Sequence, residues 1–567
     1  MDLSQRSINS QALAFLFGVV SHILVFARGE WDRLAPRIVS AHILLCAAVL
    51  VAYVFNTDQT FAQCVIETCK ADLALIGGLC VSIGLYRLLF HPLRSFPGPL
   101  SARVSAFWVF RKNWPDLKLY IKLRSIHDHY GDFVRIRPRE LSICHPDTIN
   151  DVHGPRSRVQ KGEFYEQIHP AHSLQFTRDP DQHRHQRRYW DRAFQVKAMQ
   201  EYLPRIVKHY KILMGVFTAS SATGRPIDVS RLFMDLFFDV VSDLILGESF
   251  NTLTTGKRNS IIEGFLAQHQ NLGFALLNMW VFHLIRCIPL VASRIIYWIQ
   301  WCASSGTRKK ELREKPSRKQ RWYANALKNR KQMQDISPDL YTHLSQSDTF
   351  EADGVHETNL VIIAGADTNA ITVSNVCYLL CQHPEYQQKL YEELSDLPVH
   401  EGVISDQHLM GKPWLLSIIN ETLRLYPPVP GGLQRQTPPE GATIAGRYVP
   451  GNMVVSTPTY ALHRDPRAFV RPDEFLPERW TQPSLILRKD AFVPFSYGTY
   501  NCAGRPLAMM QLRMVVAMVV QKFELSFAPG RDVEYKRYIQ DQADCFTLHI
   551  NPLPLVLRER NNPEHVT

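Results

Sequence analysis

Three long apolar stretches occupy the first 90 of the 567 residues, over residues 8–26, 38–55 and 73–90. A helix rising about 1.5 Å per residue needs roughly 20 residues to cross the hydrocarbon core of a bilayer, and each stretch approaches that length. Because the three follow one another with short polar connectors, we predict a membrane anchor over residues 1–90 with up to three transmembrane helices. One or two spans is the alternative. No basic segment with a small-residue cleavage site begins the chain, which disfavours a cleaved signal peptide.

The charges between these stretches predict an orientation. Residues 27–37 are weakly positive, residues 56–72 are net negative, and residues 87–112 carry basic but no acidic side chains. Because positively charged loops stay in the cytoplasm, we expect a lumenal N-terminus and a cytoplasmic chain after residue 90. Cys64 and Cys69 would then face an oxidising lumen, where they either pair or remain free thiols.

A proline-rich hinge over residues 91–100 separates the anchor from the rest of the chain. Residues 101–567 show no internal repeat and no low-complexity linker, so we expect one large domain. Its hydrophobic periodicity predicts a mainly α fold with a minor β-sheet region. The principal expected helices cover residues 115–130, 181–217, 228–247, 354–383 and 505–523, and the expected strands lie within residues 133–143 and 431–460.

The formal net charge of +11 suggests an anionic partner surface. The densest basic tract of the chain, residues 308–321, lacks interleaved aromatic side chains. A solvated face beside an anionic membrane explains such a tract better than nucleic acid does, and we predict no nucleic-acid binding. Eleven cysteines over this length are too sparse for a disulfide scaffold, so one of them is free to serve as a ligand.

One cysteine lies in a loop punctuated by glycines, directly before a predicted helix. The loop holds Phe495, Gly498, Cys502 and Gly504. A thiolate ligand to haem iron needs N–H donors and positive potential, and glycine-turned backbone and a helix N-terminus supply both. Taken by itself, such a cysteine is more often a buried structural one.

This loop resembles the haem-binding segment of the cytochrome P450 family, Phe-x-x-Gly-x-Arg-x-Cys-x-Gly. The resemblance covers nearly all of residues 91–567 and implies the cytochrome P450 fold, here preceded by N-terminal transmembrane helices. It also implies haem b with Cys502 as the axial iron ligand and Phe495, Gly498 and Gly504 around it. Tyr500 stands where the family has an arginine that pairs with a haem propionate. A tyrosine offers one neutral hydrogen bond, roughly half as strong as a charge-assisted one.

Other family positions are expected to compensate for Tyr500. His183 and Arg187 match a Trp-x-x-x-Arg segment with histidine in place of tryptophan, and Arg435 matches a further arginine. By resemblance all three are donors to the propionates.

A second motif of the family, Glu-x-x-Arg, occurs as Glu421 and Arg424. These positions share one helix face, and apolar flanks predict a buried pair. Arg479, in a Pro-Glu-Arg-Trp segment, matches the third partner. A buried charged group needs complete pairing, so we assign these three residues a structural role behind the thiolate loop.

A third motif places Ala364, Asp367 and Thr368 in the long central helix. Ala364 and Thr368 are four residues apart and share a face, and the threonine hydroxyl can bond the i−4 carbonyl or water. By resemblance, Ala364 adjoins the haem, and Asp367 and Thr368 are catalytic residues that manage protons.

The resemblance as a whole implies a membrane-anchored haem-thiolate monooxygenase that inserts one oxygen atom from O₂ into a hydrophobic small molecule. Hydroxylation, epoxidation and multistep oxidation are all within its scope. The sequence looks most like fungal microsomal members that act in terpenoid, polyketide or alkaloid biosynthesis. The implied electron source is NADPH, through NADPH-cytochrome P450 reductase and optionally cytochrome b5, at the endoplasmic reticulum membrane with a cytoplasmic catalytic domain. By analogy the pocket includes residues 361–364, 429–433 and 538–546.

Two other functions stay open at this point. One is a haem-thiolate isomerase or dehydratase that needs no O₂, and the other is a catalytically silent haem-binding scaffold in the membrane.

Overall fold

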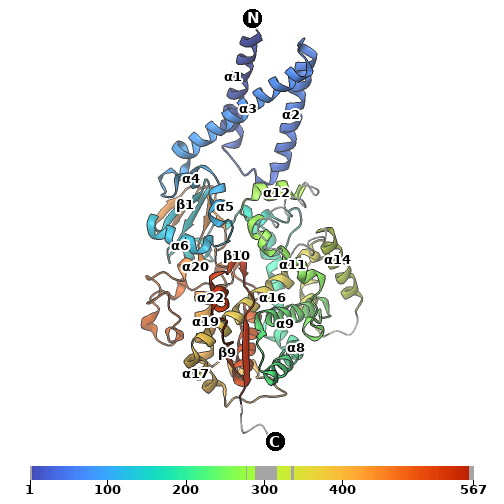
Figure 1. Ribbon diagram of the computed structural model, residues 1–567, viewed down its shortest axis with the longest axis vertical. Coiled ribbons are helices and arrows are strands. Elements are labelled where there is room, and N and C mark those ends of the chain that lie inside the picture. The colour runs from blue at the N-terminus through green and yellow to red at the C-terminus, as the bar shows by residue number, and fades with distance from the viewer. Residues whose placement is uncertain (1–2, 276, 288–315, 334–336, 561–567) are drawn as a thin grey trace.

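The computed structural model describes residues 3–275, 277–287, 316–333 and 337–560. Three long helices project from one end of a larger body, which contains the sheets and the remaining helices (Figure 1). The N-terminus lies at the tip of this projection and the C-terminus at the opposite end of the molecule. The predicted fold class, mainly helical with minor sheets, is confirmed.

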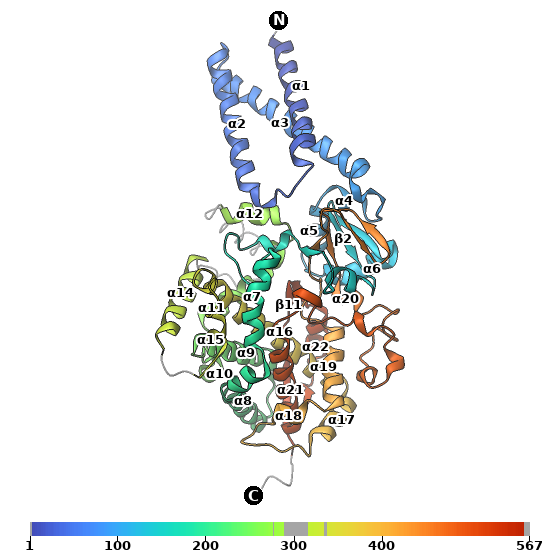
Figure 2. The ribbon, with the colours of Figure 1, turned by 180° about the vertical axis from the view of Figure 1, so that it is seen from behind.

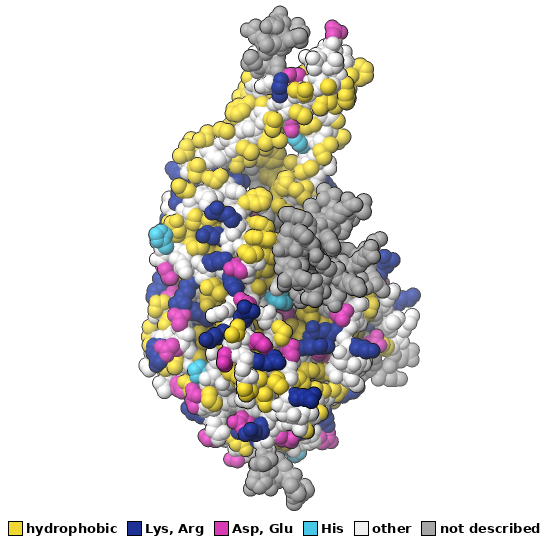
Figure 3. Space-filling view, viewed as in Figure 1, with side chains coloured by type: hydrophobic (Ala, Val, Ile, Leu, Met, Phe, Trp, Pro, Cys, Tyr) yellow, Lys and Arg dark blue, Asp and Glu magenta, His cyan; other side chains and the backbone are white. Residues whose placement is uncertain are grey.

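The projecting helices are α1 (Leu3–Ser21), α2 (Ala35–Asn56) and α3 (Phe61–Leu85), with five further residues, Tyr86–Phe90, continuing the last as a π-helical turn. Each is long and apolar enough to cross a membrane, and almost none of their surface is buried within the protein. The space-filling view shows hydrophobic side chains covering this projection, while charged ones are scattered over the body (Figure 3).

Helix α3 begins at Phe61, well before the third predicted stretch at residue 73. A capping box between Thr60 and Gln63 starts it early. Two of the three acidic residues expected in the second connector, Glu67 and Asp72, therefore lie on the helix itself, where Glu67 pairs with Lys70 at 2.8 Å. Asp72 faces His42 of α2 at 3.0 Å. Because Glu67 and Asp72 each have a basic partner, both can lie on the apolar helix α3.

Two glycines bring α1 and α3 into close contact. A Cβ added at Gly78 would lie 2.1 Å from the Phe15 carbonyl oxygen, and one at Gly18 would lie 2.2 Å from that of Leu75. Small residues of this kind let helices approach within a membrane. His22 Nδ1 and Ser82 Oγ, 2.8 Å apart, add a polar contact between the same helices.

Cys64 and Cys69 are both free. They stand five residues apart on α3, so their side chains leave the helix in different directions, and Cys64 is buried while Cys69 is exposed. The sequence left open a disulfide between Cys64 and Cys69 or two free thiols, and the structure has the free thiols.

The proline-rich segment after the anchor is fixed to the body. Leu93 and Phe96 are almost completely buried in a small core with the first strands. The Pro97 carbonyl accepts a 2.7 Å hydrogen bond from the amide of Arg135. A Cβ at Gly98, whose φ is +149°, would lie 2.4 Å from the Arg135 carbonyl oxygen. The hinge therefore sets the anchor at a defined place on the sheet.

The body is organised around α16 (Phe350–Gln382). This helix is apolar enough to span a membrane, but 72% of its apolar window is buried inside the protein, which identifies it as a core helix. The other helices of at least seven residues are α5 (Phe107–Asn113), α6 (Leu119–Tyr130), α7 (Pro180–Ala193), α8 (Val196–Thr223), α9 (Val229–Leu246), α11 (Ser260–Ala275), α12 (Met279–Cys287), α14 (Pro316–Gln332), α17 (Pro384–Leu394), α19 (Pro413–Leu425), α21 (Arg505–Lys522) and α22 (Asp532–Gln540).

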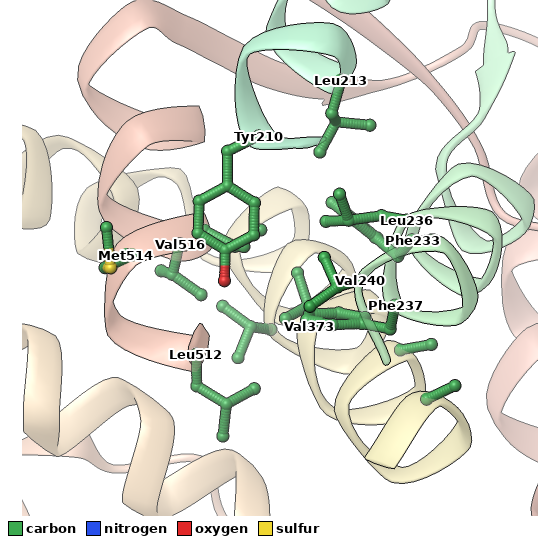
Figure 4. Close-up of a cluster of buried hydrophobic side chains, with 14 of the residues drawn as sticks. Tyr210, Leu213, Phe233, Leu236, Phe237, Val240, Val373, Leu512, Met514 and Val516 are labelled. Atoms are coloured by element: carbon green, nitrogen blue, oxygen red, sulfur yellow. The ribbon is translucent and has the colours of Figure 1, made fainter. Parts of the chain in front are cut away.

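The main core lies where α8, α9, α16 and α21 meet. Figure 4 shows Tyr210 of α8, Phe237 of α9, Val373 of α16 and Leu512 of α21 converging on one another. This packing joins α16 to α21 and so sets the positions of the two segments that carry the predicted site.

A five-stranded sheet lies at the anchor end, in the order β1-β2-β8-β5-β3. Its strands are β1 (Phe133–Arg137), β2 (Glu140–Ile143), β8 (Val454–Ser456), β5 (Arg435–Gln436) and β3 (Gln160–Lys161). Smaller sheets are formed by β6 (Ala442–Ile444) with β7 (Arg447–Val449), by β10 (Ala543–Cys545) with β11 (Thr547–His549), and by β4 (Ile227–Asp228), β12 (Pro554–Glu559) and β9 (Phe523–Phe527). Most of the basic tract, residues 308–315, lies outside the described residues.

Candidate active site

Cys502 stands at the end of a tight loop that leads into α21. Its amide donates to the Phe495 carbonyl at 2.9 Å, and the Asn501 amide donates to the Gly498 carbonyl at 3.1 Å. Gly498 has a φ of +68°, and a Cβ there would lie 1.8 Å from the His153 carbonyl oxygen. The loop can therefore form only with glycine at this position. The Cys502 side chain is exposed.

Two opposing effects act on the Cys502 thiol. Although part of the residue is exposed, desolvation of the sulfur leaves the pKa of the thiol above its ordinary value, and the amides of Gly504 and Arg505 and the positive charge of Arg187 offset this in part. The lowering groups are those expected at a helix N-terminus that stabilises a thiolate.

The predicted motif on α16 has the expected local geometry. The Thr368 hydroxyl donates to the Ala364 carbonyl at 2.9 Å. Ala364 is exposed although buried residues surround it on this core helix. Asp367 is 1% exposed, its Oδ2 has no hydrogen-bond partner, and burial raises its pKa to about 7. An acid with a pKa near neutrality can both take up and release a proton.

Three buried basic side chains gather around Tyr500. The Lys161 ammonium and the Arg435 guanidinium each lie 5.1 Å from the Tyr500 ring centroid, and the His183 ring lies 4.7 Å away, edge-on. Tyr165 accepts a 3.0 Å hydrogen bond from Arg435 on the other side. We call Lys161, His183 and Arg435 the basic cluster.

Among the described residues no acid forms an ion pair with the basic cluster, although the buried Glu357 acts on Lys161 through its charge. Lys161 donates only to the carbonyls of Leu174 and Gln175, both at 2.8 Å. The Arg435 Nε and the His183 Nδ1 are buried without a partner. Buried cations need anions, so the cluster fits a ligand that brings carboxylates, as the two propionates of haem do.

Arg187 lies close enough to act on Lys161 and His183 through its charge, but its hydrogen bonds go to other residues. Its Nη atoms donate to the backbone and side-chain oxygens of Asn501 at 2.8 and 2.7 Å, and its Nε donates to Asp191 at 2.7 Å. In this structure Arg187 therefore holds the residue next to Cys502, and its expected contact with a propionate stays a prediction.

Glu421, Arg424 and Arg479 are all completely buried and paired. Glu421 accepts from Arg424 at 2.7 and 3.0 Å and from Arg479 at 3.2 Å. The indole of Trp480 and the amide of Leu476 complete its shell at 3.0 and 3.1 Å. The complete pairing predicted for a buried Glu-x-x-Arg motif is present.

Lys161 and His463 belong to this site but were not predicted from the sequence. His463 bridges the Glu421–Arg424 pair to the segment before the cysteine loop, because its Nε2 accepts from the Val493 amide at 3.0 Å. Neither residue lies in a motif with characteristic spacing. A lone lysine within a polar stretch gives no periodic signal of burial, and only the pairing of β3 with β5 places it beside Arg435.

A cavity of about 150 Å³ opens between the sheet, α6, α11 and the loop before β5. The predicted pocket segments 429–433 and 538–546 contribute Val429, Gly431, Gly432, Asp544 and Phe546 to its wall, whereas residues 361–364 do not line it. Phe164 and Gln434 also line it, and each is next in sequence to a residue around the basic cluster. Burial raises the pKa of Asp544 to about 6.

Comparison with known proteins identifies the family of the chain. The cytochrome P450 family model matches residues 96–552. The cytochrome P450 monooxygenase nodW of Hypoxylon pulicicidum is 35% identical over 97% of this chain and 98% of its own. The cytochrome P450 monooxygenase phqL of Penicillium fellutanum is 32% identical over 98% and 96%. The tryprostatin B 6-hydroxylase of Aspergillus fumigatus is 31% identical over 97% and 96%.

The chain belongs to the cytochrome P450 family and is an oxidoreductase of the monooxygenase type. Members of this family bind a thiolate-ligated haem iron and take electrons from a redox partner. The residues in the structure fit that group, because the accessible Cys502 thiol suits the iron, and buried donors without a partner, Arg435 Nε and His183 Nδ1, suit the propionates.

Proposed function

We propose that this protein is a membrane-anchored haem-thiolate monooxygenase in which the Cys502 thiolate would hold the haem iron. The observation that carries the assignment is the accessible Cys502 thiol at the N-terminus of α21, with backbone donors from Gly504 and Arg505. Haem bound there supplies the activation of O₂. The remaining roles fall to this chain's own side chains.

The basic cluster and Tyr500 hold the propionate end. Arg435 contributes charge, and Lys161 contributes N–H donors, since burial and the charge of Arg435 lower the pKa of Lys161 well below its ordinary value. His183 contributes a neutral N–H, since burial and the nearby cations lower its pKa to about 3. Phe495, Gly498 and Gly504 shape the thiolate loop, and Ala364 leaves room on α16. Glu421, Arg424 and Arg479 brace the loop from behind.

Asp367 and Thr368 handle protons beside Ala364. The hydroxyl of Thr368 is bonded back to the helix, which opens the helix to water. Asp367, with a pKa of about 7, holds or releases a proton at its Oδ2. Both groups favour oxygen insertion over isomerisation or dehydration, which need no proton delivery to an oxygen site.

The anchor places the enzyme in the endoplasmic reticulum membrane with its catalytic domain in the cytoplasm. Electrons then come from NADPH through a flavoprotein reductase, optionally with cytochrome b5. Arg188 and Arg192 are exposed on α7, the helix whose Arg187 holds the cysteine loop. An acidic partner is favoured at such a basic face.

The substrate is a hydrophobic small molecule of fungal secondary metabolism. Support comes from the cavity beneath the anchor and from relatives such as the tryprostatin B 6-hydroxylase. The test is incubation of the full-length protein in microsomes with reductase, NADPH and isotopically labelled O₂ on terpenoid, polyketide and alkaloid precursors. One labelled oxygen in the product supports the proposal. Turnover without NADPH and O₂ identifies an isomerase or dehydratase, and binding without turnover of any precursor identifies a scaffold.

A further inference from the structure

The first connector of the anchor, residues 27–34, is bound to the catalytic body. The Glu30 carboxylate accepts hydrogen bonds from both Nη atoms of Arg178, at 2.9 and 3.2 Å. Burial raises the pKa of Glu30, but the Arg178 contacts outweigh it and leave the pKa below its ordinary value, so this is an ion pair. The backbone carbonyl of Gly29 accepts a 3.1 Å bond from Arg139, which lies between β1 and β2.

A second set of contacts fixes the other end of this connector. Arg139 forms an ion pair with Glu163, with its Nη1 3.9 Å from Glu163 Oε2, and Asp32 lies close enough for its charge to act on Glu163. Burial, and then the charge of Asp32, raise the pKa of Glu163 well above its ordinary value. The short helix that begins at Asp32 also packs on α12, which lies under the lower end of α2 (Figure 2).

The domain residues that bind the connector lead directly to the site. Arg178 donates from its Nε to the Lys161 carbonyl at 3.2 Å and from Nη2 to the side chain of Gln436, which adjoins Arg435, at 3.1 Å. The same guanidinium thus holds the connector and both strands of the basic cluster. Bidentate and multiple contacts of this kind fix orientation as well as distance.

Glu163 begins the turn Glu163–Glu166, which borders the cavity. The next residue, Phe164, lines the cavity and stacks on Phe546, with ring centroids 5.3 Å apart. Tyr165 accepts the hydrogen bond from Arg435. The connector therefore touches one end of a four-residue turn whose centre forms the wall of the cavity and a support of the basic cluster.

We propose that the connector, residues 27–34, braces the cavity wall through its contacts with the catalytic domain, and that Glu30 is a positioning residue acting through Arg178 on the basic cluster and on the turn Glu163–Glu166. The anchor is then more than a tether, because its first connector is bound to the catalytic domain and supports a turn whose Phe164 lines the cavity. The contact between connector and turn stands on the structure alone, whereas its effect on haem and substrate rests on the proposed function.

The test is a double-mutant cycle on the full-length protein in lipid nanodiscs, with Glu30→Ala, Arg178→Ala and the pair. The matched control is Asp58→Ala, an exposed acid in the second connector. The first readout is amide hydrogen exchange of residues 160–166, which does not require haem. The second is the dissociation constant of 1-phenylimidazole from its titration of the haem spectrum.

Glu30→Ala is expected to speed exchange in residues 160–166 and to weaken 1-phenylimidazole binding by about tenfold, as for interactions coupled in one network. The same change should have little effect when Arg178 is already alanine, and Asp58→Ala should resemble wild type. Equal effects of Glu30→Ala in both backgrounds, or none in either, would overturn the proposal.

The two readouts separate the connector from the haem assignment. Faster exchange with no haem spectrum in any variant upholds the positioning contact and rejects the proposed function. Should Arg178→Ala fail to fold, Glu30→Gln is compared with Asp58→Asn. Faster exchange in the former alone supports the proposal, and indistinguishable exchange overturns it.

Discussion

Arg424 and His463 hold each other by two hydrogen bonds across 39 residues of sequence. Arg424 Nη1 donates to the His463 carbonyl at 2.8 Å, and His463 Nδ1 lies 3.2 Å from the Arg424 carbonyl. Since the Nε2 of the same ring accepts from Val493, the ring must be neutral with its proton on Nδ1. A single imidazole thus connects the buried Glu421–Arg424 pair to the segment that leads into the cysteine loop.

This neutral ring makes the fold sensitive to acid. Burial and the charge of Arg424 lower the pKa of His463 to about 3, against an ordinary value of 6.5. As the pH falls, His463 is protonated in the unfolded chain before it is protonated in the fold. The free energy of unfolding that is present above pH 6.5 therefore decreases below pH 6.5, by about 1.4 kcal/mol per pH unit. We expect His463→Gln to be less stable at pH 7 and the gap to wild type to narrow toward pH 5. Thermal unfolding at both values tests this, and a constant gap would show that the pKa of His463 is the same in the fold as in the unfolded chain.

The two glycines beside Cys502 differ in what they tolerate. At Gly498 a Cβ would meet the His153 carbonyl oxygen, whereas at Gly504, with φ of −79°, its nearest contact would be Phe194 at an ordinary 3.8 Å. We expect Gly498→Ala to lose most bound haem and Gly504→Ala to keep it. Haem content per polypeptide is the measurement. Equal retention in the two variants would contradict the described loop.

Asp367 gives the opposite pH dependence to His463. Burial raises its pKa from 3.8 to about 7, so the fold binds a proton that the unfolded chain releases, and stability falls as the pH rises through this interval. We expect Asp367→Asn to gain stability relative to wild type between pH 5 and 8, by on the order of 1 kcal/mol or more. The Asp367→Asn variant should also form less product and more hydrogen peroxide per NADPH consumed than wild type does. The same difference in stability between Asp367→Asn and wild type at pH 5 and pH 8, together with an unchanged ratio of product to peroxide, would contradict the role assigned to Asp367.

Neighbouring glycines of α3 provide a test of the anchor. Gly78 packs on the backbone of α1, whereas a Cβ at Gly77 would meet nothing within 4 Å. Gly78→Val should force α1 away from α3 and increase protease cleavage of the anchor in nanodiscs, and Gly77→Val should behave as wild type. Matching cleavage of the two variants would mean that α1 and α3 do not pack in this way.

Local sequence patterns predicted those parts of the site that a single segment defines. The bond from Thr368 to Ala364 follows from helix spacing, and the position of Cys502 follows from its glycines and the helix after it. Residues brought in by long-range pairing were not predicted. Lys161 joins Arg435 only through strand pairing, and Arg187 reaches Asn501 only because α7 crosses the loop.

The anchor shows the same limit. Hydropathy located its three helices, but it placed the start of the third too late, because Glu67 and Asp72 read as connector when their partners are unknown. Lys70 and His42 provide those partners, from the same helix and from α2. Nothing in the spacing of Glu30 indicated that it pairs with Arg178, 148 residues away.

The central claim is that Cys502 ligates the haem iron through its thiolate. The most direct measurement is the carbon monoxide difference spectrum of the dithionite-reduced protein, for wild type, Cys502→Ala and, as control, Cys144→Ala, which removes a buried thiol outside the cysteine loop. Wild type and Cys144→Ala should show the red-shifted band from which the family takes its name, and Cys502→Ala should lack it. An unchanged band in Cys502→Ala would contradict the account.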